Sequence, residues 1–208
     1  MLKIILTHGF QNRNPWPKMK ANPGRFAYQV FFHSDEARQL LEEDLERTVR
    51  VIMRASTDEP SCGKDLEFQA KLAGIELVNG ITKKASNDDE ITPSSKMLSP
   101  SDMKMYAHQF KECGFLNPLR WYRNVERNWK WNAKIRGRHV TMPALMVTAS
   151  DDLILTPSMT KGMDAYCDKL EIVHVQESSH WILQQQPEQC EKILCAWLQR
   201  LPASTSRL

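Results

Sequence analysis

The sequence predicts an α/β protein in which parallel strands alternate with helices. Two short apolar segments with β-branched residues, 143–148 and 170–175, each end in a polar turn. Between them, Thr156 followed by Pro157 is a typical helix start, because threonine can cap a helix and proline fits its first position. A strand, a helix, a second strand and a second helix in this order are typical of parallel βαβ layering.

The turns after these two strands carry ionisable groups. Asp152 follows the first strand and His180 follows the second. Because ligands of open parallel sheets bind at the carboxyl ends of the strands, we expect both side chains at a site. A carboxylate bonded to an imidazole fixes its tautomer and stabilises the imidazolium, so the pair can activate a water or a nucleophile. The alternative, that both are ordinary turn residues, stays open at this point.

The composition is that of an ordinary soluble protein with one domain, or one domain and an appendage. The chain has 208 residues, 41% of them hydrophobic, and a net charge of +3, too small to indicate nucleic acid or membrane by itself. Five cysteines without CxxC spacing indicate reduced thiols inside the cell. No apolar run reaches the roughly 18 residues of a membrane span, and residues 1–6 are too short for a signal peptide. We expect no cofactor and no metal.

The first half of the chain alternates predicted loops with a few regular segments. Residues 3–7 are predicted to form a buried strand, and residues 11–25, rich in asparagine and proline, a loop. Residues 26–32 are aromatic and are predicted to be extended. Ser34 is expected to cap one helix that runs to about residue 54, whereas residues 56–99 have weak periodicity and are predicted to form a poorly ordered loop.

Regular structure is predicted again after this loop. Ser99 and Asp102 form a good helix start, and Gly114 is expected to end that helix. Asn117 and Pro118 are expected to open the next helix.

Segment 119–131 of this next helix mixes basic and aromatic residues, which can indicate a nucleic-acid surface. Its basic residues fall three or four apart on one face, as in a solvated stripe. Trp121, Val125 and Trp129 fall four apart on another face, as in a buried stripe. Because no second basic element accompanies them, we expect no nucleic-acid partner. The hydroxyl of Tyr122 either points into a cavity or is satisfied within the core.

Several segments resemble the soluble, bifunctional epoxide hydrolases of animals. They are 20–23, 28–32, 114–131, 143–149 and 179–181. The similarity runs in collinear order from about Leu6 to Trp197, with a poor match in the loop 57–95. The long run around Trp121 and Tyr122 is highly specific.

The resemblance implies a partial α/β-hydrolase fold, with a truncated, mostly parallel sheet and a helical lid. Residues 1–24 are then a strand and loop leading into the lid, and residues 25–138 are the lid itself, including the loop 56–99. Residues 139–203 form the carboxyl-terminal βαβα part of the hydrolase core, and residues 204–208 a flexible tail.

The resemblance also implies site roles. His180 falls on the general base, Asp152 on the acid that orients it, and Tyr28 and Tyr122 on the two lid tyrosines that hydrogen-bond the epoxide oxygen. Trp181 would line the substrate pocket. In the family, an aspartate opens the epoxide and forms an ester, which a histidine-activated water hydrolyses to a vicinal diol.

The sequence departs from the family at the nucleophile. Residues 1–27 contain no aspartate, so the sharp turn that carries the nucleophile is absent. The triplet at 8–10 resembles an oxyanion motif, but it aligns better with the stretch that leads into the lid, and Gln11 stands where that motif has proline. We therefore expect an incomplete or inactive form of the enzyme.

Three functions stay in view. The first is an epoxide hydrolase for lipid or foreign epoxides, in lipid metabolism or detoxification. The second is another hydrolase chemistry on esters or haloalkanes, against which the paired tyrosines count. The third is a non-catalytic protein that binds lipophilic ligands or forms a homodimer. Ser206, Arg207 and Leu208 resemble a peroxisomal import signal, so we expect a cytoplasmic or peroxisomal protein that meets the import receptor.

Overall fold

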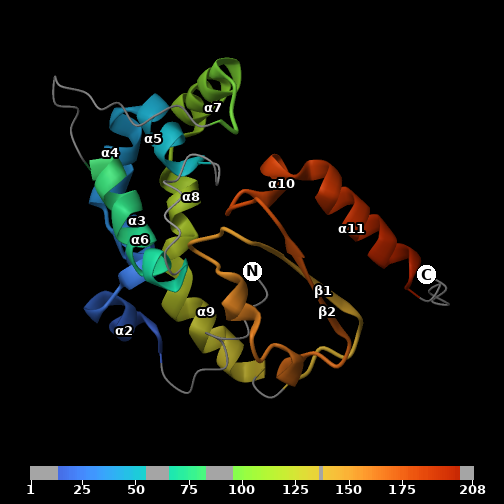
Figure 1. The fold of residues 1–208 in the computed structure, drawn as a ribbon. Coiled ribbons are helices and arrows are strands. Elements are labelled where there is room, and N and C mark those ends of the chain that lie inside the picture. Colours follow the sequence, from blue (N-terminus) through green and yellow to red (C-terminus); the bar gives the residue numbers. More distant parts are fainter. Residues whose placement is uncertain (1–13, 55–65, 83–95, 136–137, 202–208) are drawn as a thin grey trace, which may run out of the picture.

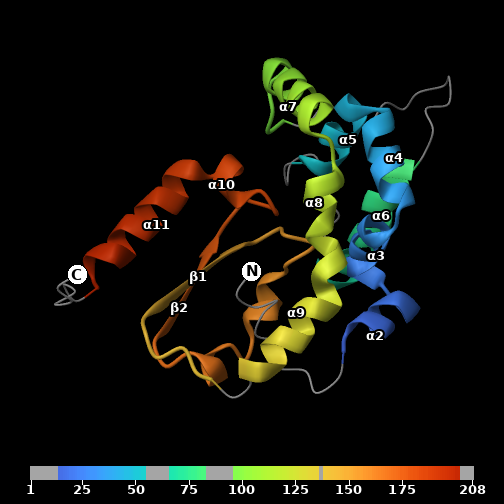
Figure 2. The ribbon, with the colours of Figure 1, turned by 180° about the vertical axis from the view of Figure 1, so that it is seen from behind.

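The structure, a computed structural model, describes residues 14–54, 66–82, 96–135 and 138–201. Helices α2 to α7 gather on one side, the two strands lie with α10 and α11 on the other, and α8 and α9 run between them (Figures 1 and 2). The predicted strand at 3–7 and the tail with its tripeptide lie outside the described residues.

The first side and the connection, up to residue 135, are here called the helical part. Its α-helices are α2 (Trp16–Ala21), α3 (Ala27–His33), α4 (Glu36–Glu43), α5 (Leu45–Ile52), α6 (Leu66–Thr82), α7 (Pro100–Cys113), α8 (Leu116–Arg120) and α9 (Val125–Asn132). Its 3-10 helices are η1 (Gly24–Phe26), η3 (Tyr122–Asn124) and η4 (Ala133–Ile135).

The remainder, from residue 138 on, is here called the sheet part. It contains β1 (Ala144–Ala149), β2 (Leu170–Val175), α10 (Ile182–Gln185) and α11 (Pro187–Gln199). The two strands pair in parallel, as the sequence predicts, with Met146 opposite Ile172 and Ala149 opposite Val175. Parallel pairing brings the carboxyl ends of β1 and β2 to the same edge, where the turns with Asp152 and His180 begin.

Besides a smaller cluster between α5 and α7, the helical part is held together by one main cluster of buried side chains. Leu41, Leu119 and Ala37 are almost fully enclosed, and the cluster also contains Phe32, Val51, Ile81 and Phe115. Burying a leucine side chain stabilises the folded state by about 1.5–3 kcal/mol. Tyr28 and Tyr122 pack against this cluster, so the same core that folds the helices fixes these two tyrosines.

The predicted helix of 34–54 is two helices. The Oγ of Ser34 does accept a hydrogen bond from the N–H of Ala37 at 3.2 Å, as a capping residue would. However, Asp44 interrupts the helix with an extended backbone and accepts the N–H of Arg47 at 3.0 Å, which caps α5. Aspartate favours this capping position over a helix interior because its short side chain competes for backbone groups.

Two predictions for the first 33 residues were wrong. The predicted loop of 11–25 contains the short helix α2, which has Pro17 near its first position. Residues 26–32, predicted as extended, lie largely in α3. Aromatic residues favour strands, but Tyr28, Phe31 and Phe32 are spaced so that one side of a helix meets the core.

The predicted loop of 56–99 was also wrong, because it contains the 17-residue helix α6. Its apolar residues are not confined to one face, and it contains Gly74 and Gly80, so the sequence shows little helical periodicity. Close packing explains the glycine at residue 74, because a Cβ there would lie 2.1 Å from the carbonyl oxygen of Arg25. The missing side chain lets α6 touch η1, which leads into α3.

The prediction for α7 is confirmed. The Oγ of Ser99 accepts the N–H of Asp102 at 3.2 Å, and the carboxylate of Asp102 accepts the N–H of Ser99 at 3.1 Å. Gly114 ends the helix with a φ of 63°, and Glu42 fills the space beside it, accepting the N–H of Phe115 at 2.8 Å.

Two further expectations need correction. The segment after Thr156 forms two short 3-10 helices, η5 (Pro157–Thr160) and η6 (Asp164–Tyr166), instead of an α-helix. Trp121 was predicted to belong to a buried stripe, but 62% of it is exposed. The chain turns through η3, which breaks the continuous helix on which that prediction depended.

Among the described residues, no helix is both long and apolar enough to cross a membrane.

Candidate active site

The turn after β1 holds Asp152 in one orientation. Only 8% of its side chain is exposed, and its Oδ1 accepts the N–H groups of Ile154 and Leu155, each at 2.8 Å. This local pattern is an Asx-type turn, in which the carboxylate replaces a backbone acceptor. The turn therefore orients the carboxylate through contacts within its own loop.

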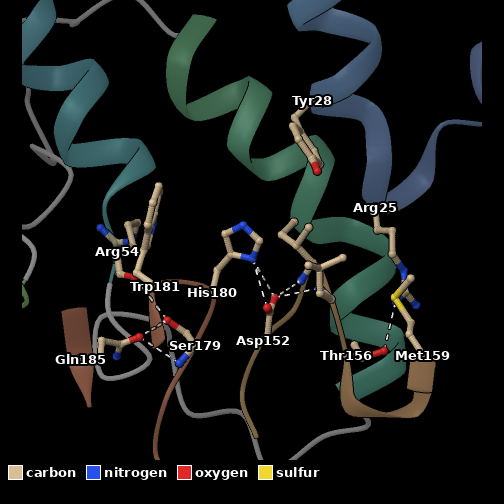
Figure 3. A network of polar contacts seen from close by, with 12 residues as sticks. Arg25, Tyr28, Arg54, Asp152, Thr156, Met159, Ser179, His180, Trp181 and Gln185 are labelled. Atoms are coloured by element: carbon tan, nitrogen blue, oxygen red, sulfur yellow. Dashed lines mark hydrogen bonds and ion pairs between the residues drawn. The ribbon is translucent and has the colours of Figure 1, made fainter. Parts of the chain in front are cut away.

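The turn after β2 brings His180 to that carboxylate. The Nδ1 of His180 lies 3.1 Å from Oδ2 and 3.3 Å from Oδ1 of Asp152. A carboxylate can only accept, so Nδ1 carries the hydrogen, and in the neutral ring Nε2 is left with its lone pair. Figure 3 shows Tyr28 extending from α3 toward the side of the His180 ring away from Asp152.

The pKa of Asp152 is below its ordinary value. Burial by itself raises this pKa. The hydrogen bond and positive charge of His180, together with the N–H groups of Leu155 and Ile154, outweigh the burial and leave the net shift downward. Asp152 is consequently ionised at neutral pH and can stabilise a protonated imidazole.

The rings of Tyr28 and Tyr122 lie next to each other in the helical part. Their ring centroids are 5.9 Å apart at an interplanar angle of 82°. Burial raises the pKa of Tyr28 to about 12 and also raises the pKa of Tyr122. The Nε2 of Gln29 donates to the Tyr28 hydroxyl oxygen at 3.0 Å, which leaves the hydroxyl hydrogen of Tyr28 for another acceptor. Both phenols are thus neutral hydrogen-bond donors at physiological pH.

These side chains share one cavity of about 590 Å³ between the helical part and the sheet part. Tyr28, Tyr122, Asp152, His180 and Trp181 all line it. Much of the remaining wall is apolar and includes Phe32, Leu41, Val51, Ile52, Met53, Leu77, Phe110, Phe115 and Leu119. The structure therefore brings every predicted site residue to a single pocket that suits a lipophilic molecule with one polar centre.

Trp181 has a second contact besides the cavity. Its ring stands nearly perpendicular to that of His180, with centroids 5.8 Å apart. Its Nε1 donates to the carbonyl oxygen of Ile52 at 2.8 Å, at the end of α5. The predicted pocket residue thus also joins the two parts of the molecule.

Three residues with polar contacts at the site were missed by the sequence analysis. Gln29 contacts the Tyr28 hydroxyl, and Gln185 contacts Ser179, the neighbour of His180. Glutamine and serine are common surface residues, so type and spacing give no sign of these contacts. Within the ranges that the structure covers, no group of three or more histidine, cysteine or acidic side chains could hold a metal.

The amino-acid sequence is similar to those of curated epoxide hydrolases. No family model matches the chain. It is 36% identical over 187 residues to the bifunctional epoxide hydrolase 2 of Mus musculus, covering 88% of this chain and 32% of the mouse protein. It is 35% identical over 201 residues to the same-named protein of Sus scrofa, covering 95% of this chain and 34% of the pig protein.

Solved structures agree in fold. Epoxide hydrolase A from Mycobacterium thermoresistibile matches 94% of this chain and 59% of its own, with a TM-score of 0.67 and 21% identity. An epoxide hydrolase from an endophytic Streptomyces matches 90% of this chain and 56% of its own, with a TM-score of 0.71 and 21% identity. The fold is therefore a partial α/β-hydrolase fold, as the sequence predicted.

Over nearly its whole length the chain resembles the bifunctional epoxide hydrolases, and it shares the α/β-hydrolase fold of solved epoxide hydrolases. It spans about a third of the length of the curated mammalian relatives. The resemblance stated from the sequence is confirmed.

Proposed function

We propose that the chain carries the base and the proton donors of an epoxide-hydrolysing site. In this proposal His180 activates water, Asp152 orients it, and Tyr28 and Tyr122 hydrogen-bond the epoxide oxygen. The observation that carries it is the single cavity lined by both tyrosines and the imidazole–carboxylate pair. The helical part would serve as the lid over this cavity.

The proposed reaction has two steps. A carboxylate nucleophile, which residues 1–27 do not supply, attacks an epoxide carbon, the C–O bond breaks, and a tyrosine hydroxyl protonates the departing oxygen. The Nε2 of His180 then takes a proton from water, and the resulting hydroxide attacks the ester carbonyl. The ester C–O bond breaks, the departing diol oxygen takes up the proton of the added hydroxide, and the carboxylate is regenerated. The imidazolium returns its proton to the tyrosinate, so the products are a vicinal diol and the starting site.

The electrostatics of the site support these roles. The raised pKa of both tyrosines keeps them protonated, so they can donate as negative charge develops on the epoxide oxygen. The lowered pKa of Asp152 keeps a negative charge beside His180 when it becomes imidazolium. The apolar walls favour an epoxide of a lipid or of a lipophilic foreign compound.

For the 208-residue polypeptide alone we propose ligand binding with little or no turnover. Residues 1–27 contain no aspartate that could act as a nucleophile ahead of the helical part. A base without the ester that it hydrolyses cannot complete the cycle. The polypeptide would then be an incomplete or inactive form of the enzyme.

Two measurements test this proposal. Titration with a lipophilic dialkylurea, whose carbonyl oxygen stands in for the epoxide oxygen, should give saturable binding by calorimetry. Incubation with a lipophilic epoxide should give no diol above the buffer rate. Substantial diol formation that disappears in His180→Ala would contradict the inactive form, and absence of urea binding would contradict the site.

The second candidate is a non-catalytic protein that binds lipophilic ligands or forms dimers. Exposed apolar side chains on the sheet part favour self-association: Ile172 is 37% exposed, Leu194 49% and Leu198 50%. Light scattering during the urea titration measures the molecular mass and so separates ligand binding by a monomer from dimer formation. A dimer whose mass is unaffected by Leu194→Ser and Leu198→Ser would count against this face as the contact.

A further inference from the structure

Both neighbours of His180 contact the backbone at the carboxyl end of α5 or just beyond it. The Nε1 of Trp181 donates to the carbonyl oxygen of Ile52 at 2.8 Å. The Oγ of Ser179 lies 3.3 Å from the carbonyl oxygen of Arg54. The last carbonyls of a helix lack partners within the helix, so they are natural acceptors for side chains from another element. Figure 3 shows the contact between Ser179 and Arg54, on the same side of His180 as Trp181.

Gln185, the last residue of α10, holds Ser179 from the other direction. Its Oε1 accepts the backbone N–H of Ser179 at 2.9 Å and the Oγ–H of Ser179 at 2.6 Å. A hydroxyl has one hydrogen, so the contact with Arg54 and the bond to Gln185 compete, and the bond to Gln185 is shorter. Ser179 is only 8% exposed, so water cannot readily replace these partners.

His180 itself has weaker support than its neighbours. Its side chain is 42% exposed, and its ring meets Asp152 at distances of 3.1 and 3.3 Å. The same turn includes Glu177 with a φ of 52°, a left-handed conformation that is unfavourable for a residue other than glycine. The local sequence therefore does not favour this turn by itself, and contacts from elsewhere must hold it.

We propose that Gln185 and Trp181 are positioning residues for His180. Gln185 holds the residue before the base, and Trp181 ties the residue after it to α5. Together they keep Nδ1 on Asp152 and Nε2 toward the cavity. This inference rests on the proposed function, in which His180 is the base. Because one anchor lies in the helical part, a shift of α5 would also move the base.

The test uses the labelled 208-residue chain and nuclear magnetic resonance near pH 8, where an ordinary imidazole is neutral. The ¹⁵N shifts of the His180 ring report which nitrogen carries the hydrogen. The unmodified chain should show the Nδ1–H tautomer. Gln185→Met, which removes the acceptor at similar size, and Trp181→Phe, which removes the indole N–H but keeps an aromatic ring, should each give a mixture of tautomers.

Two matched variants separate positioning from a general structural effect. Gln185→Glu keeps an acceptor for Ser179 and should preserve the Nδ1–H tautomer. Gln189→Met makes the same change at an exposed position of α11, and should also preserve it. In Gln185→Met and Trp181→Phe the carboxyl ¹³C titration of Asp152 should move upward by roughly one pH unit, because a charged partner is less well placed.

The outcomes are decisive in either direction. An unchanged tautomer and Asp152 titration in both Gln185→Met and Trp181→Phe would overturn the proposal. An equal change in Gln189→Met would also overturn it. If Gln185→Met does not fold, Trp181→Phe decides alone. The measurement needs neither turnover nor ligand, so failure of urea binding would reject the proposed function without affecting this result.

Discussion

The ring of Tyr28 on α3 meets the ring of Tyr122 on η3 edge to face, with centroids 5.9 Å apart. Both rings pack against the buried cluster of the helical part, and both line the cavity that contains His180. The core therefore places two protonated phenols in the cavity that the imidazole of His180 also lines.

Loss of either hydroxyl should weaken binding of a dialkylurea. Tyr28→Phe and Tyr122→Phe keep the ring packing but remove a donor. We expect each to weaken binding about tenfold, corresponding to about 1.4 kcal/mol for one hydrogen bond. Isothermal titration calorimetry measures the change. Tyr106→Phe, which alters a tyrosine of α7 that also lines the cavity, should bind like the unmodified chain, and unchanged affinity in both test variants would contradict the assigned donors.

The Asp152–His180 pair should make stability depend on pH. The folded-state pKa of Asp152 is below its ordinary value of 3.8. The stabilisation that ionised Asp152 adds to the free energy of unfolding is therefore fully present above the ordinary pKa. It is lost as the pH falls through the folded-state pKa. We expect Asp152→Asn to lower the free energy of unfolding at about pH 7 and to lower it much less at about pH 3.

Urea denaturation at the two pH values measures this effect. Asp151→Asn changes the exposed neighbour of Asp152 and serves as the control. An equal loss of stability at both pH values in Asp152→Asn would show that the ionised carboxylate contributes nothing to folding.

Gly74 should be intolerant of a side chain. In Gly74→Ala the new Cβ would lie 2.1 Å from the carbonyl oxygen of Arg25, so α6 or η1 must move. We expect a loss of about 1–3 kcal/mol in the free energy of unfolding, as for other overpacked sites. Asn79→Ala, at an exposed position of the same helix, should be neutral or slightly stabilising. Equal stability of the two variants would mean that α6 does not pack closely against η1.

We also propose that the tripeptide Ser206–Leu208 directs import into peroxisomes. These residues lie outside the described part of the chain, so the proposal rests on their resemblance to the import signal. A fluorescent protein ending in the last ten residues of the chain should accumulate in peroxisomes. Removal of the final three residues should leave it in the cytosol, and identical distributions would refute the signal.

The sequence predicted the strands and the site better than the helical part. The two strands and the pair Asp152 and His180 depend on local apolar runs and on the rule that parallel strands end at one edge. The capping box of α7 is also local. By contrast, α3 and α6 form because their aromatic residues and glycines meet a shared core, which depends on residues far apart in the chain.

Some residues of the candidate site could be predicted from the sequence, and others could be found only in the structure. The resemblance to the family pointed to Tyr28 and Tyr122, because a long specific run surrounds the second of them. Gln29, Ser179 and Gln185 have contacts that only the folded chain creates. Sequence patterns find the groups proposed to react, whereas the residues that hold those groups in place are revealed by distances.

A structure of the chain bound to a dialkylurea would test the central claim most directly. We predict that the urea carbonyl oxygen lies within about 3.2 Å of both the Tyr28 and the Tyr122 hydroxyl oxygens, a normal hydrogen-bond distance, with His180 on the same cavity. A ligand bound elsewhere, or a cavity in which the two hydroxyls turn away from the ligand and from His180, would contradict it.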